Sequence, residues 1–448
     1  MLMTRDKGFY MKLAALSIPI VLQNLITYSV GLADNLMIGT LGDSAVSGVY
    51  MGNQIQTVLQ VLSAGIEGGI LILSAQYWGK KDTRSIRKIV SVGMCFSVIL
   101  GIFLTVVCAL KPAAVLGIFT GEKAVIEKGV EYLSVVCFSY VFFCITQALI
   151  AAMRSVETAR IGMLVSLCSL IIDVGLNYLL IFGKLGCPEM GVRGAAAATL
   201  IARIAECLIM LFYVTFKDKK LKFRFNAVFS IDRAILKDFL KYGTPLILGQ
   251  LVWGSNLAAN SIILGHFSES VITAASLANT VNNLMYVSMN GLAAAVGIVI
   301  GNIVGSGDIS KIREYSKTVQ ILFLVLGLLT GAVFALIKNP FISLYSITEE
   351  AVMYSKQFIG VLCFTCIGTC YQCGCLMGLV KSGGDVGFVF KNDTIFVFGV
   401  VIPLSLLAAT AGCQPWVVFF CLKIDQLLKC IVAVVKIQKY NWMKNLTR

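Results

Sequence analysis

Twelve long apolar segments, each carrying few charged residues, make up most of this chain. A helix that crosses a bilayer needs about 20 mostly apolar residues, and every segment reaches that length. The segments run over residues 12–38, 45–76, 89–111, 128–152, 161–183, 192–216, 239–264, 273–303, 314–337, 354–380, 392–413 and 415–437. The pattern predicts an all-α integral membrane protein with twelve transmembrane helices, six in each half.

Polar residues recur on one face of two of these segments. They are spaced three or four positions apart, which places them on one side of a helix. The second segment carries Asn53, Gln56, Gln60, Ser63 and Glu67, and the eighth carries Asn279, Asn283, Tyr286 and Asn290. We expect the two stripes to line opposite walls of a water-filled cleft, with hydrogen bonding inside a dry bundle as the alternative. Further candidates for the lining, on the first and seventh segments, are Gln23, Tyr28, Gln250, Asn256 and Asn260.

The chain also matches itself at an offset of 226 residues, which indicates an internal duplication. The matched pairs include Pro19 with Pro245, Gly39 with Gly265, Asn53 with Asn279, Gly79 with Gly305 and Asp82 with Asp308. The period far exceeds the 20 to 50 residues of solenoid repeats, so a whole bundle is duplicated. The prediction is two pseudo-symmetric six-helix bundles over residues 1–220 and 239–448, joined by a basic cytoplasmic linker at 221–238.

Composition agrees with a membrane protein. Hydrophobic residues make up 58% of the chain and charged residues 13%, and the mean hydropathy is +0.87. Lys and Arg gather in the N-terminal segment and in every second connection, which predicts a multi-pass protein of the cell membrane with both termini cytoplasmic. This distribution also explains the net charge of +14, so no nucleic-acid partner is expected.

The chain has 15 cysteines, of which Cys363, Cys366, Cys370 and Cys373 follow one face of the tenth segment. A metal or redox site there is one interpretation. Zinc sites usually gather ligands from turns or from two elements, and the single histidine, His266, is remote in sequence. We favour packing of small, polarizable side chains between helices.

Ionisable residues within the segments are the strongest functional signal, because each costs about 2.5 to 3.5 kcal/mol at the centre of a membrane helix. They are Asp34, Glu67, Asp173, Arg203, Glu206, Asp393, Lys423, Asp425 and Lys429. Arg203 and Glu206 can pair along one helix, as can Asp425 and Lys429, so these pairs are expected to be structural. Asp393 has Lys391 nearby, so it either has a functional role or simply lies at the cytoplasmic mouth of the protein.

Asp34 and Asp173 have no basic partner on their own helices, which favours binding of a proton or a small cation. The duplication sharpens this expectation, because Asp34 is matched by the uncharged Asn260. Duplicated halves with a charge in only one are typical of a transporter with a single ion-coupled half.

Several short strings resemble the multidrug and toxic compound extrusion (MATE) family over essentially the whole chain. They are "IPIVLQNLITYSVGLADNLMIGTLGDSAVSGV", "SAQYWGKKD", "LNYLLIFG" with "GVRGAAAAT", "KYGTPL" and "GLVKSGGD", in this order. The resemblance implies two six-helix bundles with a cleft between them. It also implies export of cationic or amphipathic organic compounds, including drugs and toxic metabolites, in exchange for protons or sodium ions, without a cofactor and as a monomer.

The resemblance further implies which residues bind the coupling ion. Because the seventh segment has no acid, the match is to the DinF-like branch, which couples through the N-terminal bundle. Asp34 then takes the place of the first-helix acid, Thr199 that of a hydroxyl, and Asp173 with Asn177 that of a polar pair. The family pattern has Asn followed by Asp in this pair, whereas the order here is reversed, which leaves the direct ligand open. A sodium ion or a proton fits these four residues, and Pro19 is the expected hinge of the first helix.

Three other classes compete with an exporter. A flippase for lipids or lipid-linked oligosaccharides shares the wider architecture, but would need a basic cavity for a pyrophosphate. An enzyme would need a catalytic cluster that the chain does not show. A channel would need a continuous selectivity ring, which two pseudo-symmetric halves supply with difficulty.

Overall fold

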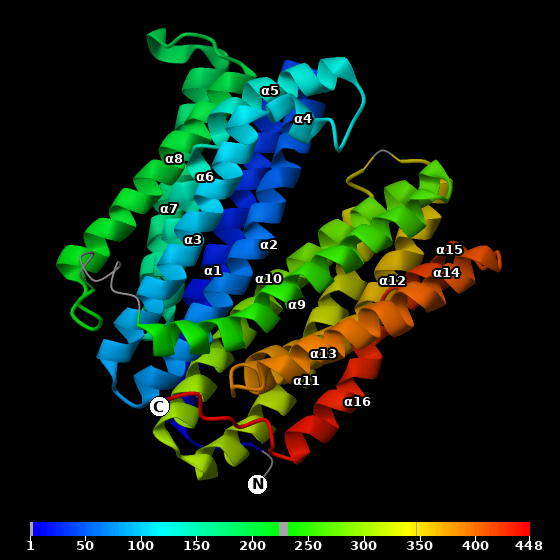
Figure 1. Ribbon diagram of the computed structural model, residues 1–448. Helices are drawn as coiled ribbons and strands as arrows, with labels where there is room; N and C mark the ends of the chain where they lie inside the picture. Colours follow the sequence, from blue (N-terminus) through cyan, green and yellow to red (C-terminus); the bar gives the residue numbers. More distant parts are fainter. Residues whose placement is uncertain (1–2, 224–231, 346) are drawn as a thin grey trace. The chain divides into compact units, whose positions relative to one another are not determined.

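The computed structural model describes residues 3–223, 232–345 and 347–448 and is built of helices (Figure 1). The first half contains α1 (Lys7–Ile38), η1 (Gly39–Leu41), α2 (Asp43–Gly79), α3 (Thr83–Leu110), α4 (Pro112–Leu116), α5 (Lys123–Val136), α6 (Ser139–Ser155), α7 (Arg160–Phe182), η2 (Lys184–Gly186), α8 (Val192–Phe212) and η3 (Tyr213–Lys217). The second half contains α9 (Arg233–Gly265), α10 (Glu269–Ser306), α11 (Ile309–Ile342), α12 (Glu349–Gln372), η5 (Cys373–Lys381), α13 (Val386–Phe396), η6 (Val397–Val401), α14 (Ile402–Thr410), α15 (Pro415–Cys421) and α16 (Asp425–Gln438). The all-α prediction is confirmed. Residues 224–231 of the predicted linker lie outside the described residues, and α9 begins within its last part.

Within the described residues, ten helices are long and apolar enough to cross a membrane. The predicted segment 128–152 is not one continuous helix, because α5 and α6 meet at a bend of 53° and together form an eleventh candidate span. The Cys137 carbonyl at this bend accepts a hydrogen bond of 2.8 Å from the Thr105 hydroxyl. A side chain thus satisfies a carbonyl at the point where the helix is interrupted.

The twelfth predicted segment, 415–437, is also broken. It consists of the short helices α15 and α16, and neither is long enough alone to cross a bilayer. Lys423 lies in the break, and Asp425 begins α16. The sequence pattern therefore located this segment but did not show its interruption.

By contacts, the chain divides into two compact units. The N-unit comprises residues 22–247, and the C-unit comprises residues 1–21 and 248–448. These units differ from the predicted halves, 1–220 and 239–448, at the first helix of each half. The first part of α1 packs in the C-unit, and the first part of α9 packs in the N-unit.

The first parts of α1 and α9 are thus exchanged between the two units, and the two exchanges occur at repeat-related residues. The unit boundaries fall after Val21 and after Ile247, which are separated by the repeat offset. A Cβ on Gly65 of α2 would lie 2.6 Å from the Cα of Ile247, and one on the repeat-related Gly291 of α10 would lie 3.2 Å from the Cα of Val21. Each exchanged helix therefore crosses a helix backbone at a glycine that permits the close approach.

The beginnings of the exchanged helices are anchored in a related way. Asp6, just before α1, accepts a hydrogen bond from the Tyr315 hydroxyl on α11 within the C-unit. Its repeat partner Asp232, just before α9, forms a 2.7 Å ion pair with Lys88 on α3 within the N-unit. Both aspartates thus tie the start of a first helix to the third helix of the opposite half.

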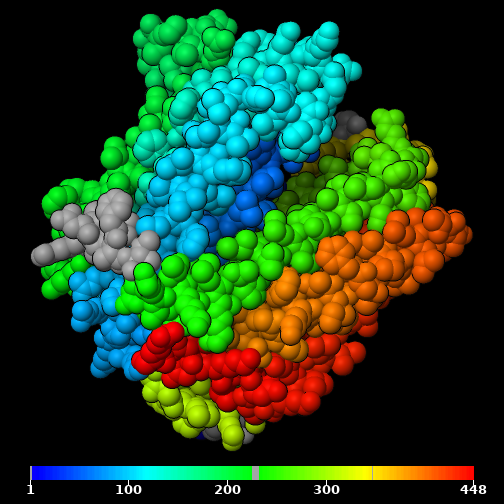
Figure 2. All heavy atoms as spheres, viewed as in Figure 1, coloured from blue at the N-terminus to red at the C-terminus, as the bar shows by residue number. Residues whose placement is uncertain are grey.

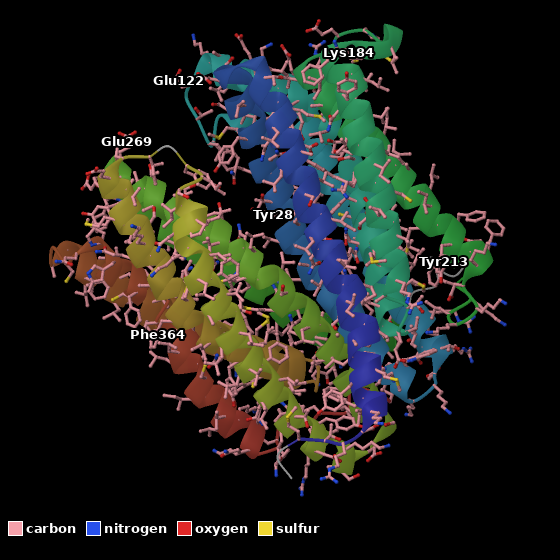
Figure 3. All side chains as sticks on the ribbon, turned by 180° about the vertical axis from the view of Figure 1, so that it is seen from behind. Tyr28, Glu122, Lys184, Tyr213, Glu269 and Phe364 are labelled. Atoms are coloured by element: carbon pink, nitrogen blue, oxygen red, sulfur yellow. The ribbon has the colours of Figure 1, made fainter. Side chains whose placement is uncertain are left out.

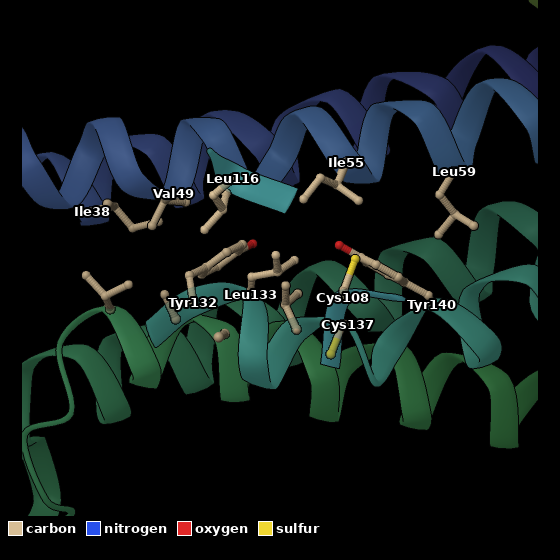
Figure 4. Packing of buried hydrophobic residues seen from close by; sticks show 14 of the residues in the cluster. Ile38, Val49, Ile55, Leu59, Cys108, Leu116, Tyr132, Leu133, Cys137 and Tyr140 are labelled. Atoms are coloured by element: carbon tan, nitrogen blue, oxygen red, sulfur yellow. The ribbon is translucent and has the colours of Figure 1, made fainter. Parts of the chain in front are cut away.

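The core of the N-unit is an apolar cluster between α2, α5, α6 and α8. Leu59 of α2 and Leu133 of α5 are fully buried in it, and Tyr132 and Tyr140 project their rings into the same layer (Figure 4). The helices alternate in direction, so that Glu122 and Lys184 lie at one end of the unit and Tyr213 lies toward the other (Figure 3). The hydroxyl of Tyr132 reaches α2, where it donates a 3.1 Å hydrogen bond to Asn53 Oδ1.

In the C-unit, the chain after α16 folds back onto the connection between η5 and α13 (Figure 2). Trp442 is fully buried, and the Lys444 backbone N–H donates a 2.7 Å hydrogen bond to the Gly383 carbonyl. Asp385 forms ion pairs of 2.7 Å with both Lys436 and Lys444. The C-terminal segment therefore anchors this connection by apolar burial and by charge.

Candidate ion and substrate site

The structure brings Asp34 of α1 next to Asp173 and Asn177 of α7. The Asn177 side-chain amide donates a 2.7 Å hydrogen bond to Asp34 Oδ1 and a 3.3 Å hydrogen bond to Asp173 Oδ2. Asp173 and Asn177 lie one helical turn apart and are each 1% exposed. The amide thus links two carboxylates that would otherwise repel each other.

A cavity of about 160 Å³ opens beside this trio, entirely within the N-unit. It is lined from α1, α2, α5, α7 and α8 by Thr27, Val30, Gly31, Asp34, Asn53, Gln56, Thr57, Gln60, Tyr132, Ser169, Asp173, Thr199, Ala202 and Arg203. All four residues with a predicted role in ion coupling are therefore at or beside one cavity. The predicted stripe residues Asn53, Gln56 and Gln60 form part of the same wall.

Arg203 brings a positive charge to the cavity. Its guanidinium forms a 2.6 Å ion pair with Glu206 and stacks over the Phe143 ring at 5.3 Å. The predicted pairing along α8 is thus present. Arg203 also lies close enough to act electrostatically on Asp34 and Asp173, so these acids do have a basic neighbour, on another helix.

Two buried oxygens beside Asp34 have no hydrogen-bond partner among the described residues. They are Asp173 Oδ1 and Asn177 Oδ1. Buried polar atoms are rarely left unpaired unless a ligand, ion or water satisfies them. Carboxylate, amide and hydroxyl oxygens are hard ligands that suit an alkali cation, whereas a carboxylate pair also suits a proton.

Two further N-unit candidates, Gln23 of α1 and Glu67 of α2, lie outside this cavity. Gln23 is 4% exposed, accepts a 2.7 Å hydrogen bond from Arg154 and donates one of 3.2 Å to Ser166. Glu67 accepts a 2.9 Å hydrogen bond from the Ser63 hydroxyl. Gln23 therefore links α1 to α6 and α7 by hydrogen bonds. This fits the alternative interpretation, in which polar residues bond between helices instead of lining a water-filled cleft. Tyr28 is half-buried on α1 and also lies outside the lining (Figure 3).

The predicted lining residues of the second half all lie in the C-unit. Asn279 and Asn283 are exposed on α10, and Tyr286 lines a separate small cavity. Asn256 and Asn260 of α9 each have a buried side-chain oxygen without a hydrogen-bond partner among the described residues. Gln250 is half-buried on the same helix.

Asp393 and Asp425, the two acids predicted within membrane segments of the C-unit, are both paired. Lys429 forms ion pairs with Asp425 at 3.0 Å, as predicted, and with Asp393 at 2.9 Å. Asp393 therefore pairs across helices with Lys429 and not with its sequence neighbour Lys391. Among the cysteines of α12, Cys366 and Cys370 are buried as free thiols. Within the described residues, no three or more His, Cys, Asp or Glu lie close enough together to hold a metal ion.

Sequence reasoning missed several lining residues of the site, of which Tyr132 and Arg203 carry most of the chemistry. Tyr132 donates a 3.1 Å hydrogen bond to Asn53 Oδ1, and no spacing pattern singled it out. Arg203 was assigned a structural role alone. Its position four residues after Thr199 places both on one face of α8, which is the signal that could have included it.

Comparisons with known proteins identify the family of the chain. The profile of the MatE family matches residues 19–179 and 245–409, which is most of both halves. The chain belongs to the MatE family. Members of this family are membrane transporters, so the chain is a multi-pass membrane transporter and not an enzyme.

MatE relatives cover nearly the whole chain. The probable multidrug resistance protein NorM of Thermotoga maritima is 26% identical over 418 residues, covering 91% of this chain and 89% of the relative. The protein of the same name from Halalkalibacterium halodurans is 24% identical over 87% of this chain and 85% of its own length.

Solved structures share the MatE fold. A MATE family multidrug resistance transporter in an outward-facing conformation matches with a TM-score of 0.84 at 20% identity, covering 96% of each chain. A MATE protein in a straight conformation matches with a TM-score of 0.86 at 20% identity, covering 96% of this chain and 95% of the other.

Proposed function

We propose that this transporter exports small cationic or amphipathic organic compounds, including drugs and toxic metabolites, in exchange for protons or sodium ions by alternating access. The observation that carries the proposal is the position of Asp34. Its carboxyl group lines the N-unit cavity, while the repeat-related position in the C-unit holds the uncharged Asn260. The names of the NorM relatives support a multidrug substrate range.

The coupling follows from charge. The cavity presents the carboxylates of Asp34 and Asp173 and one guanidinium, which is already paired with Glu206. Its excess of negative charge attracts an organic cation, and the aromatic ring of Tyr132 adds a favourable surface. A proton or a sodium ion bound by Asp34, Asp173, Asn177 and Thr199 removes one negative charge, so the affinity for the cation falls and the cargo is released.

The same residue connects the cavity to the rest of α1. Asp34 lies in the part of α1 that packs in the N-unit, whereas the part before Leu22 packs in the C-unit. Any change at Asp34 that shifts or bends α1 near Pro19 is therefore transmitted along the helix to the contact of Val21 with Gly291. In this proposal both termini are cytoplasmic and the transporter acts as a monomer.

Everted vesicles test the function directly. Vesicles that contain the protein should accumulate a fluorescent organic cation when a proton or a sodium gradient is imposed, and dissipating the effective gradient should stop accumulation. Accumulation that persists without either gradient, or none in either case, would contradict antiport. Flipping of a lipid-linked oligosaccharide by the same vesicles would favour the flippase, for which the cavity shows no arginine cluster.

A further inference from the structure

A second, smaller cavity lies within the C-unit, where α10, α12 and α16 meet. Its volume is about 10 Å³, enough for roughly one water-sized group. The polar residues that line it include Asn282, Tyr286, Thr365, Lys423 and Gln426. It has no part in the ion coupling proposed for the N-unit.

Lys423 is the only charged residue of this lining. It lies in the break between α15 and α16, and its ammonium nitrogen lies 5.8 Å from the centre of the Phe419 ring. No carboxylate within the described residues forms an ion pair with it. The nearby Asp425 is already engaged by Lys429 at 3.0 Å and by the Gln426 amide at 3.1 Å.

The surrounding charges do not balance. The ionisable groups that interact here are the lysines Lys381, Lys423 and Lys429 and the aspartates Asp393 and Asp425. They leave one positive charge in excess when all are ionised. A charged side chain inside a membrane segment is costly and usually marks a ligand pathway or a partner.

Two further groups in the cavity are free to donate hydrogen bonds. The Tyr286 hydroxyl and the Asn282 amide make no side-chain hydrogen bond in the part of the chain that the structure describes. By contrast, the Thr365 hydroxyl donates to the Val361 carbonyl at 3.0 Å, and the Gln426 amide donates to Asp425. One ammonium and two neutral donors match a single carboxylate, whereas a phosphate would bring a larger charge than one lysine offsets.

We propose that Lys423, Tyr286 and Asn282 form a subsite that holds one carboxylate oxygen of zwitterionic or acidic organic substrates, an atom of about the size that the cavity admits. This inference rests on the proposed function and narrows its substrate class. The subsite selects among organic compounds by an acidic group, while the carboxylates of the N-unit cavity respond to cationic groups.

A matched pair of dyes tests the subsite. One is an amphipathic aromatic amine that carries a carboxylate, and the other is its methyl ester, which keeps the amine and loses the acid. Binding to the purified full-length chain is measured by fluorescence, and transport in vesicles is measured in parallel. Lys423→Met should weaken binding of the acid by about tenfold or more and leave binding of the ester unchanged.

Two controls keep the result interpretable. Lys423→Arg should retain the preference for the acid, and Lys439→Met, at an exposed lysine after α16, should bind both dyes like wild type. An equal loss for acid and ester, no loss for either, or tighter binding of a phosphate monoester than of the carboxylate would overturn the subsite. Failure of the wild type to transport the ester under any gradient would instead overturn the proposed function, while the binding comparison still reports on Lys423.

Discussion

The Asn177 amide joins Asp34 on α1 to α7 through a 2.7 Å hydrogen bond. The same amide reaches Asp173 one turn earlier, so a single neutral side chain holds two carboxylates together. Asp173 and Asn177 therefore belong to one site, to which α7 contributes one carboxylate and one amide.

Exchange of these two α7 residues tests whether their order matters. The double variant Asp173→Asn/Asn177→Asp restores the order of the family pattern and keeps one carboxylate and one amide on the same face of α7. It should retain gradient-driven transport within about tenfold of wild type, while Asp173→Asn alone, which removes one charge, should lose most of it. The measurement is the initial rate of dye accumulation in vesicles. Equal activity of the single and double variants would show that this pair does not bind the coupling ion.

The glycine crossings predict a sharp difference between two neighbouring positions on α2. Gly65→Ala places a methyl group 2.6 Å from the backbone of Ile247, whereas Gly68→Ala meets only the Leu246 side chain at 3.4 Å. Gly65→Ala should therefore destabilise the protein by about 1 to 3 kcal/mol, and Gly68→Ala should have little effect. Thermal unfolding in detergent measures both. Similar melting temperatures for the two variants would argue against a tight crossing at Gly65.

Lys429 should be a strong determinant of C-unit stability. Lys429→Met leaves Asp393 and Asp425 without their shared cation, and breaking a buried pair typically costs about 3 to 5 kcal/mol. The control is Lys128→Met, which removes a partly exposed ion pair with Glu131 and should cost about 0 to 1 kcal/mol. Denaturant unfolding followed by tryptophan fluorescence provides the comparison. Equal costs would mean that the buried triad contributes no more than a surface pair.

The anchor of the C-terminal segment should depend on pH. Burial alone would raise the pKa of Asp385, but hydrogen bonds from Lys436 and Lys444 outweigh it and hold the pKa below its ordinary value. A lowered folded-state pKa stabilises the protein above the unfolded-state value, about 3.9, and this contribution disappears as the pH falls through the folded-state pKa. Asp385→Asn should thus lower the melting temperature at pH 7 and pH 5, and the difference from wild type should shrink below about pH 4.

The control for this pH dependence is Glu127→Gln, at an exposed acid on α5. Its melting temperature should follow that of wild type at every pH. A deficit of Asp385→Asn that stays constant from pH 7 to below pH 4 would contradict a charge-based anchor.

Periodicity and duplication predicted the all-α bundles, because apolar length and repeat matches are properties of sequence alone. They also brought attention to Asp34 and Asp173, since a lone acid in an apolar segment is conspicuous. The functions of Gln23 and Glu67 could not be predicted in the same way, because a polar stripe looks identical whether it faces water or neighbouring helices. The exchange of helix beginnings at Val21 and Ile247 depends on contacts between distant segments, which no local pattern encodes.

The most direct test of the central claim is gradient-driven accumulation of an organic cation by Asp34→Asn in everted vesicles, compared at equal expression with Asp43→Asn. Asp43 is an exposed acid in the first turn of α2, so its variant should transport like wild type. The account predicts that Asp34→Asn folds and melts like wild type but no longer responds to the imposed proton or sodium gradient. Wild-type gradient-driven transport by Asp34→Asn would contradict it.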